Sequence, residues 1–506
     1  MKFNILNREK NTVINHAGAK AYTLTPAMEL YTSVVTSILS DTFYEKADDR
    51  LARIQALIRK NDAQFVAKLA VYAREKMYLR SIPLVLLTEL AQTHKGDNLV
   101  SRTVGRVIQR ADEITELLAC YQMANQRKET KKLNRLSKQI QKGLAEAFNK
   151  FDEYQFSKYN RTGTDVKLRD ALFLVHPKAK NEAQQVIFNK IAKDELVTAQ
   201  TWETTLSAVG QNDFDSETHK LEAKSQAWEQ LILNGKLGYM AMLRNLRNII
   251  EANVSQEAIE KVCATLSNAR AVANAKQFPF RFLSAYRGVK HLQNGRVSNI
   301  LTALETAVQH SANNIRGFDA RTRVVIAADV SGSMQRAISP KSTVQNFDIG
   351  LMLAMLLQNR CEDVVTGMFG DTWKIISVPK NNILANVLEF HRREGEVGYS
   401  TNGHLVIQDL INRRKKVDKI MIFTDCQLWN SNGGSPIAQA WAEYKKIAPN
   451  ARLYLFDLAG YGNTPVNTVN EGSVFLMAGW SDKIFDILTA IEEGSNAIAE
   501  INKIEI

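Results

Sequence analysis

Hydrophobic residues in the first three-fifths of the chain recur with the period of a helix. Between residues 49 and 58 they occupy positions i, i+3, i+6 and i+7, and residues 61–77 begin with a candidate helix cap, Asn61, and keep this period. Similar segments span residues 82–93, 99–110, 113–123, 186–192, 227–233, 239–250 and 258–266. Because short polar joints separate them, we expect stacked antiparallel helices from about Thr25 to Asn314, an α-solenoid without a repeat of fixed length.

After Arg321 short apolar runs alternate with helical segments. Strands are expected at residues 324–328, 364–369, 375–378, 419–424, 452–456 and 474–477, and helices at 349–357, 382–391, 404–411 and 482–491. Fully apolar strands that alternate with helices predict a mostly parallel sheet covered on both faces. We therefore expect two domains, a helical-repeat domain at residues 1–320 and an α/β domain at 321–506, with a ligand outside the carboxyl ends of the strands.

Bulk properties restrict the class of protein. A chain of 506 residues with 45% hydrophobic residues is expected to fold into more than one domain. No apolar run approaches the roughly 18 residues of a membrane span, and the first ten residues lack the apolar stretch of a signal peptide. The four cysteines show no metal-finger spacing. We therefore expect a cytoplasmic monomer with reduced thiols and no membrane partner.

The positive charge is concentrated in the helical part. The chain has 65 basic and 53 acidic residues, of which residues 321–506 contain 19 and 20. The remaining 46 basic and 33 acidic residues lie in residues 1–320, which therefore carry the whole net positive charge. This asymmetry favours a polyanion such as RNA or DNA as the partner of the helical part, although a basic surface that only maintains solubility explains it equally well.

Oxygen-bearing side chains follow the predicted strands of the α/β part. In AADVSGSM, Asp329, Ser331 and Ser333 come just after the first strand. Asp425 follows a second strand in MIFTDCQ, and Thr401 in GYSTNGH precedes a helix on a third connection. The first motif alone is also compatible with an ordinary turn. Two carboxylates and three hydroxyls on one rim, however, are the hard ligands that Mg²⁺ or another divalent cation prefers.

This constellation resembles the metal-ion-dependent adhesion site of von Willebrand factor A domains. The resemblance covers roughly the last third of the chain and implies that Asp329, Ser331, Ser333, Thr401 and Asp425 are the metal ligands or lie directly behind them. Ser400 competes with Thr401 for the place of the third hydroxyl.

Five segments of the helical part resemble the Ro autoantigen family, whose members carry a TROVE domain, and in particular its bacterial members. The segments are AREKMYLRSIPLVLL (73–87), KGLAEAFNKFDEYQFSKYNR (142–161), LRDALFLVHPK (168–178), YMAMLRNLRNI (239–249) and FPFRFLSAYR (278–287). The resemblance implies a ring of HEAT-like helical repeats closed by the A domain. It also implies that small noncoding Y RNA binds the outer surface and that single-stranded 3′ ends of misfolded RNA enter the central hole. RNA quality control or decay, with an exoribonuclease such as polynucleotide phosphorylase as a partner, would follow.

The resemblance also selects residues for the outer RNA site. Lys158, Arg161 and His176 match positions that the family uses for Y RNA, and they lie in a segment rich in hydrogen-bond donors. For His176 the residues alone leave another reading open, because a histidine before a proline could simply cap a helix.

Two pairs of arginines are candidates for the single-stranded site. Arg244 and Arg247 are three residues apart and share a helix face, and Arg281 and Arg287 fall in a later helix. If these faces line the hole, they grip the phosphates of a single strand without reading bases. Ion pairing inside the solenoid is the alternative.

Two other classes of function remain open from the sequence. A phosphatase or nuclease could use Asp329 and Asp425 with Mg²⁺, but no nucleophile paired with a base, no Walker A loop and no HExxH motif is present. We therefore expect no catalytic residues and no enzymatic activity. A metal-dependent adhesion adaptor, in which the basic solenoid binds an acidic protein, is the other alternative.

Overall fold

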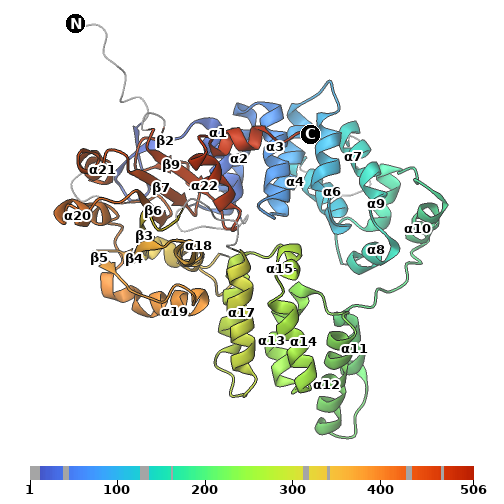
Figure 1. The fold of residues 1–506 in the computed structure, drawn as a ribbon. Helices are drawn as coiled ribbons and strands as arrows, with labels where there is room; N and C mark the ends of the chain where they lie inside the picture. The colour runs from blue at the N-terminus through green and yellow to red at the C-terminus, as the bar shows by residue number, and fades with distance from the viewer. Residues whose placement is uncertain are drawn as a thin grey trace. The chain divides into compact units, whose positions relative to one another are not determined.

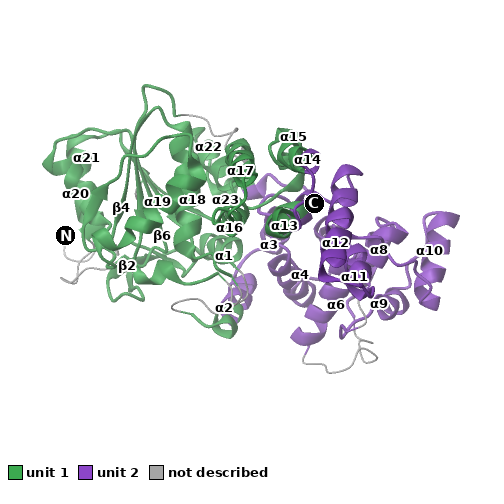
Figure 2. Ribbon diagram, turned by 90° about the horizontal axis from the view of Figure 1, so that it is seen from below, with its two compact units in different colours: residues 1–51, 242–251, 259–500 green, residues 52–241, 252–258, 501–506 purple. Residues whose placement is uncertain are grey.

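A computed structural model describes residues 12–37, 45–125, 136–160, 163–311, 318–338, 342–428, 436–468 and 472–506. The chain forms two compact units (Figure 2), of which unit 1 comprises residues 1–51, 242–251 and 259–500, and unit 2 comprises residues 52–241, 252–258 and 501–506. The N-terminal segment thus packs with the α/β part. The ring implied by the resemblance concerns the placement of the units and stays a prediction.

Unit 2 consists of helices, as the apolar period predicts (Figure 1). Its helices are α2 (Ala47–Lys60), which begins in unit 1, α3 (Ala63–Glu75), α4 (Ser81–Thr93), α5 (Leu99–Val107), α6 (Asp112–Ala124), α7 (Lys138–Phe148), α8 (Glu153–Tyr159), α9 (Leu168–Val175), α10 (Glu182–Lys193), α11 (Trp202–Gln211) and α12 (Glu217–Leu233). Helix α3 packs on the next helix, α4, and alternate helices also pack on one another, α3 against α5 and α5 against α7. This is the arrangement expected for stacked helical pairs.

Local polar contacts set two helix ends differently from the prediction. Asp62, not Asn61, caps α3, because its carboxylate accepts the amide hydrogens of Gln64 and Phe65 at 2.8 and 3.1 Å. Helix α5 ends at Val107 instead of residue 110, since the carboxylate of Glu113 accepts the backbone N–H groups of residues 109 and 110 and so begins the next helix.

Unit 1 contains a six-stranded sheet in the order β5-β4-β3-β6-β7-β9. Its strands are β3 (Arg323–Asp329), β4 (Asp363–Phe369), β5 (Trp373–Ile375), β6 (Lys419–Thr424), β7 (Arg452–Asp457) and β9 (Val474–Ala478). All neighbours are parallel except β4 and β5, which form a hairpin. The predicted strand at residues 375–378 is largely wrong, because the chain leaves the sheet after Ile375.

Helices cover both faces of this sheet, as expected. The helices of this part of the chain are α18 (Asn346–Arg360), α19 (Ile383–Arg393), α20 (His404–Asn412), α21 (Pro436–Ile447), α22 (Ile484–Glu492) and α23 (Ala497–Asn502), which ends in unit 2, with 3-10 turns η2 (Gly332–Gln335) and η3 (Glu394–Val397). Apolar residues of α20 and α21 pack against one face of the strands. On the other face α18 contacts β3 and β6, and α22 contacts β9. Helix α21 was not predicted.

An N-terminal hairpin adds a second, small sheet to unit 1. Strands β1 (Thr12–Ile14) and β2 (Lys20–Thr23) pair antiparallel, and β2 pairs with β8 (Asn463–Thr464). Helix α1 (Pro26–Val35) follows and is buried against β9, where the hydroxyl of Tyr31 donates to the carbonyl of Ala478 at 3.2 Å. The apolar pattern gave no signal for this hairpin, whose strands are too short for a period to show.

Five further helices lie wholly or mostly in unit 1, and the first two of them begin in unit 2. They are α13 (Tyr239–Glu251), α14 (Gln256–Leu266), α15 (Ala269–Ala275), α16 (Pro279–Val289) and α17 (Val297–Ser311). Helix α16 packs on α18, and the carboxylate of Glu305 on α17 accepts the backbone N–H groups of Leu384 and Ala385 at the start of α19. In the parts of the chain that the structure describes, no helix is long and apolar enough to cross a membrane.

Candidate metal centre and nucleic-acid interface

A buried aspartate lies at the end of each of three neighbouring strands, and a backbone N–H group of the loop that follows the strand binds its carboxylate. The carboxylates of Asp329 on β3, Asp425 after β6 and Asp457 on β7 each accept the amide hydrogen of the residue two positions on, at 2.9 Å. This local turn is typical of aspartate. Because β3, β6 and β7 are adjacent and parallel, the three carboxylates lie along one rim of the sheet.

The residues of the first motif are brought together as predicted. The hydroxyl oxygens of Ser331 and Ser333 are 3.2 Å apart, and both side chains are buried. The hydroxyl of Thr424 donates to the second oxygen of Asp329 at 2.6 Å. Asp425 lies close enough to Asp329 that its negative charge contributes to raising the pKa of Asp329. Hydrogen bonding from the side chain of Ser333 acts to lower the pKa of Asp425.

The structure favours Thr401 over Ser400 as the third hydroxyl. Ser400 is turned toward Asp371, which accepts its backbone N–H at 2.9 Å and also hydrogen-bonds its side chain. Thr401 is buried, and the backbone N–H of Gly332 donates to the carbonyl of Tyr399 at 3.3 Å, which ties the two loops together.

The electrostatics of the rim fit a divalent cation. Burial, followed by the charge of Asp425, raises the pKa of Asp329 to about 7, and burial also raises the pKa of Asp425. In the described residues the Oδ2 atom of Asp425 has no hydrogen-bond partner. A cation would offset the repulsion between these carboxylates. Since no three Asp, Glu, His or Cys side chains of the described residues converge on one point, hydroxyls would have to complete its coordination.

Asp457 is a rim residue that the sequence analysis missed. Burial raises its pKa to about 6, while its Oδ1 atom accepts the amide hydrogens of Ala459 and Gly460. The signal was present in the stretch YLFDLAG, which ends an apolar strand with an aspartate in the same way as Asp329 and Asp425.

The predicted outer RNA residues are exposed where the structure describes them. Lys158 lies on the surface of α8, and Arg161 lies outside the described residues. His176 ends α9 with left-handed backbone (φ 51°), and its backbone N–H donates to the carbonyl of Leu172 at 2.9 Å. Its backbone therefore caps the helix, as the alternative reading proposed, while its imidazole remains exposed for another partner.

Aromatic rings accompany the cations on these helices. The ammonium of Lys158 lies 5.9 Å from the ring centre of Tyr154, and the guanidinium of Arg169 lies 5.8 Å from that of Phe173. Tyr154 and Phe173 are 48% and 51% exposed, so core packing does not account for them. Exposed aromatic rings beside cations can stack on unpaired bases. Their signal in the sequence is the spacing of four residues between each ring and its cation.

The arginines proposed for the single-stranded site separate into two groups. Arg244 and Arg281 are exposed, and no described carboxylate pairs with either of them. Desolvation and the nearby charge of Arg244 lower the pKa of Arg281, whose guanidinium lies 5.5 Å from the ring centre of Phe280. Two adjacent, uncompensated arginines suit a phosphate. Arg247 is also exposed and pairs with Glu251 at 2.7 Å, a contact worth little at a surface.

For Arg287 the structure shows the ion-pairing alternative. Its guanidinium makes two hydrogen bonds, of 2.8 and 2.5 Å, to the carboxylate of Asp348, which is fully buried. Asp348 also accepts the backbone N–H of Gln345 at the start of α18. Arg287 therefore joins α16 to α18 and is not available as a phosphate ligand.

Comparisons with known proteins agree with this architecture. The model of the TROVE domain matches residues 34–218 and 196–328, and the model of the Ro60 vWA domain matches residues 323–491. The fold is similar to the crystal structure of the Deinococcus radiodurans RO (RSR) protein, with a TM-score of 0.56 and 16% identity over 91% of this chain and 99% of that one.

Two relatives are similar to this chain at the level of sequence. The chain is 24% identical to telomerase protein component 1 of Mus musculus over 336 residues and 23% identical to that of Rattus norvegicus over 335 residues. The matched region is 53% of this chain but 13% of each relative, so the chain spans a small part of their length.

Proposed function

The chain belongs to the Ro family, in which a TROVE domain is joined to a Ro60 vWA domain, and on that basis we propose that it is an RNA-binding protein without catalytic activity. The observation that carries the proposal is the exposed set of cations and aromatic rings on α8 and α9. Such a surface combines phosphate contacts, which supply affinity, with rings that stack on unpaired bases.

The first proposed ligand is a small structured RNA of the Y type. Lys158 and His176 would contact its backbone, because both side chains are exposed. Tyr154 and Phe173 would stack on bases in a loop or bulge, since bases within a duplex are not accessible to side chains.

The second proposed ligand is the single-stranded 3′ end of a misfolded RNA. Arg244 and Arg281 would hold its phosphates, and Arg247 would add a contact when released from Glu251. The path would be the hole of a ring formed by the helical repeats and the A domain. An exoribonuclease acting on the bound end, such as polynucleotide phosphorylase, is the partner that this role in RNA quality control or decay requires.

The proposed metal is Mg²⁺ or another divalent cation at the rim. Asp329, Ser331, Ser333, Thr401 and Asp425 would hold it, directly or through water. A cation bound there would fix the loops after β3 and β6, which otherwise hold two repelling carboxylates. All five side chains are buried, and nothing in this geometry favours a hydrolytic site or an adhesion surface over this stabilising role.

A competition between RNA forms tests the proposal. We expect a duplex with a 3′ overhang to bind better than the same duplex with blunt ends or a 5′ overhang, at physiological salt and with little dependence on overhang sequence. Equal affinity for all three would leave only a basic surface that attracts any polyanion and would refute the threaded site. Incubation of the bound RNA with Mg²⁺ should leave it intact, and turnover would refute the assignment as a non-enzyme.

A further inference from the structure

The N-terminal hairpin contacts the loop that carries Asp425. The side chain of Asn15 donates from Nδ2 to the carbonyl of Leu428 at 2.8 Å, while its Oδ1 accepts the N–H of Ala19 and so forms the hairpin turn. The backbone N–H of His16 donates to Oε1 of Gln427 at 2.8 Å. The bonds to Leu428 and Gln427 join residues more than 400 positions apart, so they depend entirely on the tertiary structure.

Gln427 connects this hairpin to the carboxylate of Asp425. Its side chain is fully buried and bridges the N–H of His16 to Oδ1 of Asn463 on β8, the latter at 3.1 Å. Its backbone N–H holds Oδ1 of Asp425 at 2.9 Å. One residue therefore carries both the bond that orients a proposed metal ligand and the bonds that anchor the loop to its surroundings.

The hairpin also reaches the other side of the proposed metal centre. Ala19 and Lys20, at the hairpin turn, line a small cavity of about 10 Å³ together with Thr401, His404 and Leu428. The cavity has room for about one water molecule. Residues of the turn thus approach both Thr401 and the loop after Asp425.

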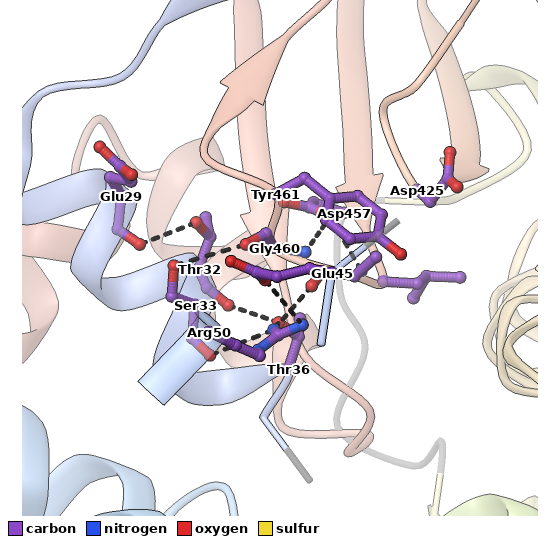
Figure 3. A network of polar contacts seen from close by, with 12 residues as sticks. Glu29, Thr32, Ser33, Thr36, Glu45, Arg50, Asp425, Asp457, Gly460 and Tyr461 are labelled. Atoms are coloured by element: carbon purple, nitrogen blue, oxygen red, sulfur yellow. Dashed lines mark hydrogen bonds and ion pairs between the residues drawn. The ribbon is translucent and has the colours of Figure 1, made fainter. Parts of the chain in front are cut away.

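The segment after the hairpin fixes the neighbouring loop in the same way (Figure 3). Arg50 on α2 is 1% exposed and donates from Nη2 to the carbonyl of Ala459 at 2.7 Å and to the hydroxyl of Thr36 at 2.9 Å. Gly460 has a positive φ of 66°, and a Cβ atom there would lie 2.4 Å from that hydroxyl. This close packing fixes the chain between β7 and β8, and hence the partner of Gln427.

We propose that residues 12–23 act as a clamp on the metal centre, with Gln427 as the positioning residue that holds Asp425 in the orientation that binds the cation. The inference rests on the proposed metal site. It follows that the affinity for the metal depends on residues at the opposite end of the sequence from the A domain. Residues directly behind metal ligands commonly change affinity 10–100-fold when replaced, and we expect a change of that size here.

Two variants remove the clamp in different ways. Gln427→Met keeps the size of the side chain and the backbone bond to Asp425. It removes the three side-chain bonds, which are the one from the N–H of His16, the one to Asn463 and a longer one, of 3.4 Å, from Nε2 to the carbonyl of Asp425. Asn15→Asp keeps the acceptor for Ala19 and removes the donor to Leu428. The matched control is His16→Ala, because the bond from His16 to Gln427 comes from the backbone and survives the substitution, while the ring contact with Tyr461 is lost.

The measurement is Mn²⁺ binding by calorimetry on the full chain, with the thermal shift that added Mn²⁺ produces as a second readout. We expect Gln427→Met and Asn15→Asp to need at least ten times more Mn²⁺ than the wild type, and His16→Ala to resemble the wild type. RNA affinity at physiological salt should be unchanged in all three variants. A variant that binds RNA like the wild type is folded, so its Mn²⁺ affinity can be compared with that of the wild type. If one clamp variant fails to fold, the other decides.

The outcomes separate the clamp from the metal site itself. Asp329→Ala serves as the reference for loss of the site. If Asp329→Ala abolishes binding while the two clamp variants bind Mn²⁺ like the wild type, the clamp is refuted and the metal site stands. An equal loss in His16→Ala would also refute it, because the clamp bonds are intact there. Unchanged binding in Asp329→Ala would refute both.

Discussion

Replacing Arg287 with methionine should destabilise unit 1 and leave the RNA affinity of the folded protein unchanged. The side chain of Arg287 is 20% exposed, and both of its terminal nitrogens bind the carboxylate of Asp348, which is 0% exposed. Methionine keeps most of the aliphatic packing but removes the charge. Asp348 would then keep one backbone hydrogen bond, from Gln345, and the neighbouring ring of His391 at 3.8 Å.

The size of the effect follows from the burial of Asp348. Removing one partner of a buried ion pair leaves an uncompensated charge and costs about 3–5 kcal/mol. Asp348→Asn should cost less, because the guanidinium left behind retains some contact with water. In the double variant Arg287→Met with Asp348→Asn no uncompensated charge remains. The loss of unfolding free energy in the double variant should therefore be smaller than the sum of the losses in the two single variants, by about 0.5–3 kcal/mol.

Urea unfolding followed by tryptophan fluorescence measures these values, since Trp441 and Trp480 are buried in unit 1. Arg281→Met on the same helix is the matched control. Arg281 is exposed and lacks a carboxylate partner in the described residues, so this substitution should cost less than about 1 kcal/mol and weaken binding of a 3′ overhang. If Arg287→Met unfolds like the wild type and loses overhang binding at least tenfold, the assignment of Arg287 to structure is refuted.

Three further predictions concern the RNA surface and the metal. Alanine at both Lys158 and His176 should weaken binding of a Y-type stem-loop, and the slope of log affinity against log salt concentration should fall by about one per lost phosphate contact. If this variant and the wild type bind the stem-loop equally at every salt concentration, the site lies elsewhere. Alanine at Tyr154 or Phe173 should cost about 1–3 kcal/mol against a stem-loop, and nothing against the same RNA with abasic loop positions. Asp329→Ala should abolish the calorimetric signal of Mg²⁺ or Mn²⁺ and leave RNA affinity unchanged, since the net positive charge lies before Arg321; a large loss of RNA binding would show that the rim faces RNA.

The sequence by itself determined the elements and the chemistry that depends on neighbouring residues. Helical periods gave α2 to α6 and the later parts of α10 and α12, but not the individual helices α7, α8, α9 and α11, and apolar runs gave the strands β3, β4, β6, β7 and β9. The motif at Asp329, Ser331 and Ser333 was predictable because a strand end and two alternate hydroxyls are local features. Asp457 was also predictable, as an aspartate that ends an apolar strand. It was not predicted as a rim residue because no serine or threonine follows it closely, as Ser331 and Ser333 follow Asp329.

The tertiary structure decided which polar groups meet. Arg287 looked like Arg281 in sequence, because the two arginines lie six residues apart on one helix. The partner of Arg287, however, is Asp348, which lies 61 residues further along the chain. Asn15 and Leu428 are 413 residues apart, and no local pattern connects them. An apolar residue needs only to be buried, so its spacing reveals the face that packs. A charged or amide side chain needs one specific partner, and the sequence does not show whether that partner is water, RNA or a distant residue that folding brings within 3 Å.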